Sequence, residues 1–237
     1  MLKKKLRLTN KLVCKSLASF TKRLEGISNS NDALQILIEM SDTQDYEEGD
    51  IFDAIKILSI HFRIEKESAV RVKILFLFSD FAAVLAPEGC FIIDEILNLI
   101  KNETSAKVIS QGLKSLHCIG KLTSETLPIA YCTKFTDFAK AKLSSPSHNV
   151  QRHSILLIGA FSSDKELLDL ISKYTDSQDA RVRAQAISSI MSMGKRSVEL
   201  SPSLYHRAEN SLKDDYECVR KEALELICEI GNRHPEQ

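Results

Sequence analysis

Five valines recur along the chain at regular intervals, and an amphipathic run follows each of them. The intervals are 38, 42, 32 and 37 residues, and the valines are Val70, Val108, Val150, Val182 and Val219. A period of about 40 residues is typical of helix pairs that stack on one another, because a single pair cannot bury its apolar face alone. This repeat restricts the fold more than any other feature of the sequence.

Apolar residues keep the same offsets from each valine, and these offsets fall on one broad face of a helix. Five positions after the valine stand Leu75, Leu113, Ile155, Ile187 and Leu224. Eight positions after it stand Phe78, Leu116, Ile158, Ile190 and Ile227. Eleven positions after it stand Phe81, Ile119, Phe161, Met193 and Ile230.

Twelve positions after the valine the residue is always small. The five residues are Ala82, Gly120, Ser162, Gly194 and Gly231. Where this residue is glycine, we expect it to adopt the left-handed conformation that ends many helices. Each valine run is therefore interpreted as the second helix of a pair.

A shorter candidate helix precedes each valine run, and a polar turn joins the two. The candidate first helices are Ile51–Ile64, Phe91–Lys101, Leu127–Leu143, Lys165–Tyr174 and Ser203–Leu212. The sequence thus predicts an all-α fold, a right-handed α-solenoid of HEAT or armadillo type, with about five helix pairs in residues 24–237. A further helix at Ala33–Met40 is expected to cap the N-terminal end of the stack.

Composition supports a helical intracellular protein. The chain has 32 basic and 32 acidic residues, and it contains only 8 glycines and 5 prolines, too few for the turns of a typical all-β fold. Its six cysteines have no short metal-ligand spacing, which favours buried free thiols over a zinc or disulfide framework. No apolar run approaches the roughly 18 residues needed to cross a bilayer, so no membrane contact is expected.

Charged residues also recur at fixed places in the repeat. Arg71, Arg183 and Arg220 directly follow their valines, and Asp179 and Asp215 lie a few residues ahead of theirs. We interpret these five residues as a structural ladder between neighbouring repeats, since repeat position predicts where they stand. The alternative is an arginine stripe that binds a phosphate or an acidic partner.

Sequence motifs of catalysis or cofactor binding are missing from the sequence. It contains no HExxH, no GxSxG and no phosphate-binding glycine loop. His148 and His153 are five residues apart, which is not the spacing that one helix face needs to chelate a metal. We therefore predict a non-enzymatic protein without a cofactor.

The first 23 residues differ in charge from the rest of the chain. They carry eight basic residues and no acidic one, whereas residues 25–53 carry nine acidic residues and no basic one. We interpret residues 1–23 as a basic arm for partner binding or nuclear import, and an inositol phosphate, RNA or an acidic protein would suit its charge. The alternative is a solvated arm that folds back on the acidic segment. The basic residues expected to act are Lys3, Lys4, Lys5, Arg7 and Lys11.

Several strings together resemble the N-terminal HEAT region of the Integrator complex subunit 4 family. The strings are KKLRLT at Lys4–Thr9, DALQIL at Asp32–Leu37, AVRVKI at Ala69–Ile74, IIDEILNLIKNE at Ile92–Glu103, DSQDARVRAQAI at Asp176–Ile187 and LKDDYECVR at Leu212–Arg220. They occur in the family's order and at similar spacing over nearly the whole chain. The basic string and the DDYE turn are the most specific of them.

The resemblance implies a nuclear scaffold that supports the RNA endonuclease module of Integrator. In that family the subunit binds the nuclease pair formed by subunits 9 and 11, and the complex acts in small nuclear RNA 3′-end processing and transcription attenuation. An inositol hexakisphosphate pocket also belongs to this module, but its residues cannot be placed on this sequence. Family members are longer, so contacts made by their C-terminal regions are not carried over.

Two other classes of protein remain as alternatives. A HEAT-repeat adaptor of karyopherin or vesicle-coat type would show the same packing pattern. A HEAT-like DNA glycosylase is close in size, but it needs a cationic groove and aromatic residues to hold an unstacked base. The chain has no tryptophan and a neutral charge balance, which argues against the glycosylase.

Overall fold

The computed structural model describes residues 16–42, 46, 48–85, 88–196 and 201–233. The described part is built from α-helices and two short 3-10 helices. The first helices of the pairs are α1 (Leu17–Glu25), α3 (Glu48–Ile64), α5 (Phe91–Ile100), α7 (Ile129–Lys142), α9 (Lys165–Ser172) and α11 (Pro202–Ser211). The second helices are α2 (Ser30–Ser41), α4 (Ser68–Val84), α6 (Ala106–Leu122), α8 (His148–Phe161), α10 (Ala180–Lys195) and α12 (Glu217–Arg233). The 3-10 helices are η1 (Glu88–Cys90) and η2 (Lys173–Asp176).

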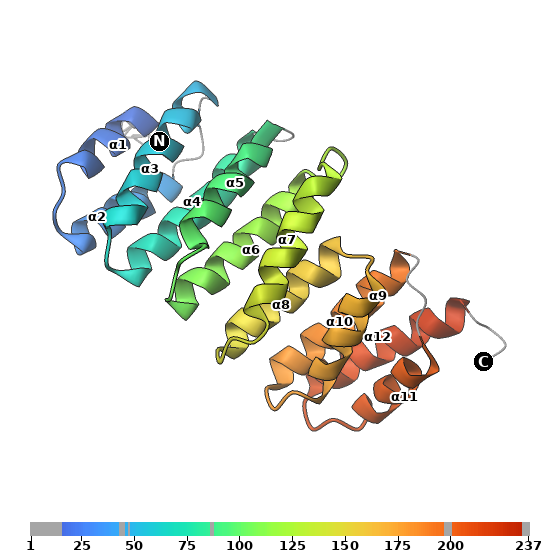
Figure 1. Cartoon of the computed structure of the whole chain (residues 1–237). Coiled ribbons are helices and arrows are strands. Elements are labelled where there is room, and N and C mark those ends of the chain that lie inside the picture. The colour runs from blue at the N-terminus through green and yellow to red at the C-terminus, as the bar shows by residue number, and fades with distance from the viewer. Residues whose placement is uncertain (1–15, 43–45, 47, 86–87, 197–200, 234–237) are drawn as a thin grey trace, which may run out of the picture.

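The helix pairs follow one another in a single row from α1 and α2 at one end to α11 and α12 at the other (Figure 1). Successive second helices pack directly on each other along the whole row, whereas the first helices from α5 onward are more widely spaced. The closely packed layer of second helices therefore lies on the inner, concave side of the stack. One continuous apolar core runs between the two layers.

The predicted repeat register is confirmed. Every repeat valine is the third residue of its second helix and is almost fully buried. The predicted first helices are also present, with boundaries that shift by a few residues. For example, α7 begins at Ile129 because Pro128 takes the N-cap position, and α9 ends at Ser172, where η2 follows. The chain is an all-α solenoid of HEAT-type helix pairs, as predicted.

The N-terminal end differs from the prediction of a single capping helix. The expected helix at residues 33–40 lies within α2, and α2 is the second member of a complete pair. Its first member, α1, buries Leu17, Phe20 and Leu24 against the core. The described residues therefore contain six helix pairs, and the boundary drawn for the basic arm at residue 23 falls inside α1. In the sequence, the lysines of residues 1–23 draw attention away from Leu17, Phe20 and Leu24, which have the spacing of one helix face.

The expected role of glycine at the twelfth position is wrong. Gly120 lies inside α6, which continues to Leu122 and ends with a negative φ of −102° at Thr123. A Cβ atom at Gly120 would come within 2.5 Å of Phe161 and 2.8 Å of Phe135. Glycine is required here because α6, α7 and α8 approach one another closely, and the helix does not end in a left-handed residue.

Two buried serines connect neighbouring second helices by equivalent hydrogen bonds. Ser115 of α6 donates to the carbonyl oxygen of Leu75 at 2.8 Å, and Ser189 of α10 donates to that of Ile155 at 3.1 Å. Each serine stands seven positions after its repeat valine, and each acceptor stands five positions after the preceding one. These bonds satisfy buried hydroxyl groups and fix the register of one repeat on the next.

Candidate partner-binding surface

A carboxylate organises three of the turns that join the helices of a pair. Glu65, Glu103 and Asp214 each stand five positions before a repeat valine. Glu65 accepts hydrogen bonds from two backbone N–H groups of its turn at 2.7 and 2.8 Å, and Glu103 does the same at 2.8 and 2.7 Å. Asp214 accepts one such bond, from the backbone N–H of Tyr216 at 2.9 Å. These carboxylates therefore help to fix the backbone conformation of the turns.

The same carboxylates also bond to the preceding repeat. Arg71 donates to Glu103 at 2.5 Å, and Ser30 donates to Glu65 at 2.8 Å. Burial raises the pKa of Glu65, but the hydrogen bonds from Glu67, Ser30 and Lys66 together outweigh it and hold this pKa below its usual value. Glu65 therefore keeps its negative charge at this junction.

Arg183 and Asp214 form the corresponding junction between the last two described repeats. Two guanidinium N–H groups of Arg183 donate to the two oxygens of Asp214 at 2.7 and 2.8 Å. Hydrogen bonding by Arg183 lowers the pKa of Asp214, and the bond to Asp214 raises the pKa of Arg183. A bidentate, largely buried pair of this kind sets both distance and orientation.

The other three residues of the predicted ladder, Asp179, Asp215 and Arg220, form their hydrogen bonds within their own repeat rather than between repeats. Asp179 caps α10 by accepting from the backbone N–H of Arg181 at 2.9 Å, and the Arg181 side chain lowers the pKa of Asp179 to about 2. Arg220 donates to the carbonyl oxygens of Asp214 and Asp215 at 2.7 and 2.9 Å. Among the described residues the Asp215 side chain forms no ion pair, and Asp214 takes its place in the contact between repeats.

Residue spacing did not single out Glu103 and Asp214, although a signal for them exists. Where the residue after the valine is arginine, as at Arg71 and Arg183, the residue five before the next valine is acidic. In the two repeats where another residue follows the valine, serine stands five positions before the next valine. These serines are Ser145 and Ser177. Matching the two columns across neighbouring repeats would have found the pairs.

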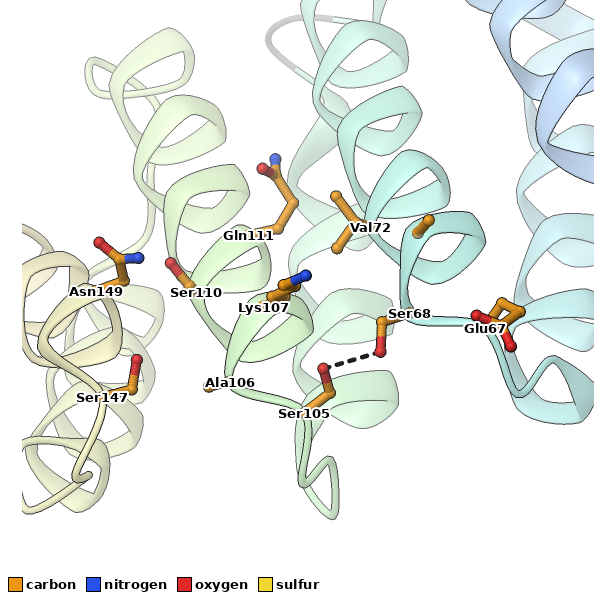
Figure 2. A pocket seen from close by; sticks show the side chains of 11 residues that line it. Glu67, Ser68, Val72, Ser105, Ala106, Lys107, Ser110, Gln111, Ser147 and Asn149 are labelled. Atoms are coloured by element: carbon orange, nitrogen blue, oxygen red, sulfur yellow. Dashed lines mark hydrogen bonds between the residues drawn. The ribbon is translucent and has the colours of Figure 1, made fainter. Parts of the chain in front are cut away.

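A hollow of about 750 Å³ opens on the concave layer where α4, α6 and α8 begin (Figure 2). Ser68 and Ser105 lie within it, and their hydroxyl oxygens are 3.0 Å apart. The N-cap residues Ser105 and Ser147 make no side-chain capping bond to their own helices. The helix N-termini together with Lys107 favour an acidic group of a partner. Further polar side chains that line the hollow are Ser110, Gln111 and Asn149.

A histidine joins α6 to α8 beside this hollow. The Nδ1 atom of His153 lies 2.7 Å from the hydroxyl oxygen of Ser110, and Arg152 donates to Nε2 at 3.1 Å. Burial, together with the positive charges of Arg152 and Lys114, lowers the pKa of His153 to about 4. The ring is thus neutral at pH 7, and because Nε2 accepts, Nδ1 carries the proton and donates to Ser110.

The remaining predicted features concern the arm, the thiols and metal binding. Lys3, Lys4, Lys5, Arg7 and Lys11 lie outside the described residues. The described cysteines carry thiols outside any disulfide, but none of them is buried as expected. Cys90, Cys118 and Cys132 are half-buried, and Cys218 and Cys228 are exposed.

In the described part of the chain, no group of three or more His, Cys, Asp or Glu side chains is placed to hold a metal ion. None of the helices within the described ranges combines the length and the apolar character that a membrane crossing requires.

Comparison with known families agrees with the packing. Residues 136–228 match the family model of HEAT repeats. Together with the stacked pairs, this match defines the class of the protein: a HEAT-repeat α-solenoid.

Relatives of the chain carry one name. The chain is 36% identical over 221 residues to Integrator complex subunit 4 of Drosophila melanogaster, which covers 88% of this chain and 22% of the relative. It is 30% identical over 246 residues to Integrator complex subunit 4 of Homo sapiens, which covers 98% of this chain and 25% of the relative. A Dictyostelium discoideum homologue is 26% identical over 77% of this chain and 16% of the relative.

The chain is therefore homologous to Integrator complex subunit 4 over most of its length, and the resemblance inferred from the sequence strings is confirmed. It spans about a quarter of the length of the curated relatives it matches, from 22% to 25% for the fly and human proteins. A solved structure from work on TOG–tubulin binding specificity matches with a TM-score of 0.45 and 15% identity, covering 89% of this chain and 90% of that one.

Proposed function

We propose that this chain serves as a non-enzymatic scaffold within the Integrator complex. The observation that carries the proposal is the identity of 36% with a protein named Integrator complex subunit 4, in a match that covers 88% of the chain. The physical arrangement supports it, because stacked helix pairs create an extended surface without the need for a single deep catalytic pocket. The concave layer from α4 to α8 offers polar and basic side chains to such partners.

The finer role follows from the resemblance. The scaffold supports the RNA endonuclease module in the nucleus, where it contributes to small nuclear RNA 3′-end processing and transcription attenuation. Its partners are other Integrator subunits, in particular the nuclease pair of subunits 9 and 11. The cleavage chemistry belongs to the nuclease pair, and this chain contributes positioning.

A tagged form of the chain, incubated with nuclear extract and analysed by mass spectrometry, tests this role. Recovery of Integrator subunits above an untagged control supports the proposal. Recovery of karyopherins or coat proteins in their place overturns it and leaves only the fold. The Arg183→Glu/Asp214→Arg variant exchanges the positions of the two charges and leaves the net charge unchanged. It controls for nonspecific charge effects on recovery of partners.

The basic arm is a second part of the proposal. Lys3, Lys4, Lys5, Arg7 and Lys11 promote nuclear entry or bind an acidic partner, an inositol phosphate or RNA. Deletion should remove residues 1–15 only, because Leu17 and Phe20 are buried in α1 and their loss would unfold the first repeat. Loss of nuclear accumulation on this deletion supports the arm, and unchanged accumulation together with unchanged recovery of partners overturns it.

A further inference from the structure

Positive charge exceeds negative charge on three neighbouring helices of the concave layer, although the whole chain is neutral. Together α4, α6 and α8 contain six lysines and arginines and one acidic residue, Asp80. By contrast, α12 alone contains four glutamates. Because Arg71 is paired with Glu103, the free positive charge is carried by the remaining basic side chains. These are Lys73, Lys107, Lys114, Lys121 and Arg152.

Three of these lysines form a row along α6. Lys107, Lys114 and Lys121 are seven residues apart, which places them on one helix face about 10 Å from each other along the axis. All three side chains are exposed. Within the described part of the chain, none of them forms an ion pair with a carboxylate, in contrast to Arg71 and Arg183. Their charge is therefore directed to whatever approaches the concave side.

An apolar hollow adjoins this row between α4 and α6. Its volume is about 490 Å³, within the roughly 300–1,000 Å³ of typical binding clefts. Two of its large apolar side chains are exposed: Phe76 by 40% and Leu122 by 49%. Lys114 and Lys121 stand at its border, and Asp80 is the acidic residue among its lining side chains. We call this site the α4–α6 hollow; its other apolar lining residues are Ala83 and Cys118.

The electrostatics of the hollow are set by its lysines. Burial, together with the positive charge of Lys121, lowers the pKa of His117 to about 4, so this imidazole is neutral at pH 7. Burial raises the pKa of Asp80, although the nearby Lys73 opposes this shift. The hollow is therefore an apolar surface bordered by two fixed positive charges.

We propose that the α4–α6 hollow binds an acidic segment of a protein partner, which inserts an apolar side chain between Phe76 and Leu122 and places its carboxylates against Lys114 and Lys121. Apolar anchors supply affinity, and complementary charges at the rim supply orientation and speed of association. The site is derived from the packing and charge of α4 and α6 alone, so it does not depend on which complex the chain joins.

A nucleic acid suits this surface less well. Binding of single strands uses a series of exposed aromatic rings on which bases stack. Here the exposed aromatic side chain is Phe76, and Lys73 already lies over its ring, with the ammonium nitrogen 4.9 Å from the ring centroid.

The test is selection of a random phage-displayed peptide library on the full chain, with counter-selection on the Lys114→Glu/Lys121→Glu variant. We expect the enriched peptides to be acidic and to carry Leu, Ile or Phe. Synthetic copies should bind the variant about tenfold or more weakly than the unaltered chain. Binding should also weaken as salt is raised, because the rim charges are exposed.

Two further variants make the outcome decisive. Lys140→Glu/Lys165→Glu changes the net charge equally on exposed first-layer positions and should leave peptide affinity unchanged. Phe76→Ser should weaken binding while the melting curve stays close to that of the unaltered chain, since Phe76 is 40% exposed. The proposal is overturned if no acidic apolar peptides are enriched, or if they bind the double variant equally well. It is also overturned if single-stranded RNA binds the hollow and the peptides do not.

Discussion

Arg183 and Asp214 join two repeats through a pair of parallel hydrogen bonds of 2.7 and 2.8 Å. Arg183 also donates to the carbonyl oxygen of Ser177 at 2.8 Å, so its guanidinium holds its own turn and the next one together. Arg71 and Glu103 make the equivalent contact nearer the N-terminus. These two ion pairs therefore act at the joints of the stack, where they limit how one helix pair rotates against its neighbour.

The Arg183–Asp214 pair should contribute measurable coupling. We expect each single substitution, Arg183→Leu or Asp214→Leu, to lower the free energy of unfolding by about 1–3 kcal/mol, because the other charge is left largely buried without a partner. The double variant should recover part of that loss. Urea unfolding of all four proteins gives the coupling energy. The exposed pair of Lys56 and Asp53 is the control, and its coupling should be below about 0.5 kcal/mol.

Two half-buried histidines should make stability depend on pH between about 6.5 and 4. The pKa values of His117 and His153 are lowered from 6.5 to about 4 by burial and then by nearby positive charges. The unfolded chain therefore takes up protons between pH 6.5 and about 4 that the folded chain does not, so stability is complete above pH 6.5 and falls as the pH drops. The slope is measured by urea unfolding at a series of pH values.

Replacement of one of these histidines should flatten that slope. His153→Gln keeps a hydrogen-bonding side chain but removes the titration, and we expect it to reduce the pH-dependent loss by about 1–3 kcal/mol. His206→Gln is the control, because the side chain of His206 is 74% exposed. Equal slopes for the unaltered chain and for His153→Gln would show that this ring does not control acid sensitivity.

The sequence predicted the helix pairs well because packing imposes the offsets from the repeat valines. Leu75 and Leu113 stand five positions after their valines, and both are fully buried, as the repeat pattern predicts for this position. The first helix pair is harder to predict, since α1 is only nine residues long and follows a lysine-rich stretch that does not share its apolar spacing. A glycine column was found but given the wrong role, because close approach between helices leaves no trace within one helix.

The binding surface was less predictable than the fold. The α4–α6 hollow depends on how far apart Phe76 and Leu122 lie, and these residues are 46 positions apart in the chain. The exposed lysines of α6 are regular in the sequence, but a lysine row on a helix is usually only a solvated face. The lysine row gains a proposed function only from the α4–α6 hollow beside it. That hollow is formed by the packing of α4 against α6, which the sequence of one helix does not reveal.

At the fifth position after the repeat valine, the loss of unfolding free energy on substitution of leucine by alanine should depend on how deeply the leucine is buried. Leu113 is fully buried, so Leu113→Ala should lower the free energy of unfolding by about 2–5 kcal/mol through the lost apolar contacts and the cavity left behind. Leu224 occupies the same column in α12 and is 55% exposed, so Leu224→Ala should cost less than about 1 kcal/mol. Thermal and urea unfolding of both variants compare them directly, and equal losses would contradict the packing described.

The glycine column gives a prediction in which the same substitution has opposite effects. At Gly120 a Cβ atom would approach Phe161 to 2.5 Å, and the Phe161 ring is held by Phe135 and His117 at centroid distances of 5.1 and 6.2 Å. The ring cannot move aside without disturbing its neighbours. Gly120→Ala should therefore destabilise the protein by about 1–3 kcal/mol, as measured by urea unfolding.

Gly231 stands in the same column of α12, and a Cβ atom there would have no heavy atom within 4 Å. Alanine lowers the conformational freedom of the unfolded chain and favours the helix, so Gly231→Ala should stabilise the protein by up to about 1 kcal/mol. The two variants share the same change in helix propensity, and their difference isolates the cost of crowding between repeats. A stabilising effect of Gly120→Ala would mean that α6 and α8 can separate more easily than the close contact of Gly120 with Phe161 implies.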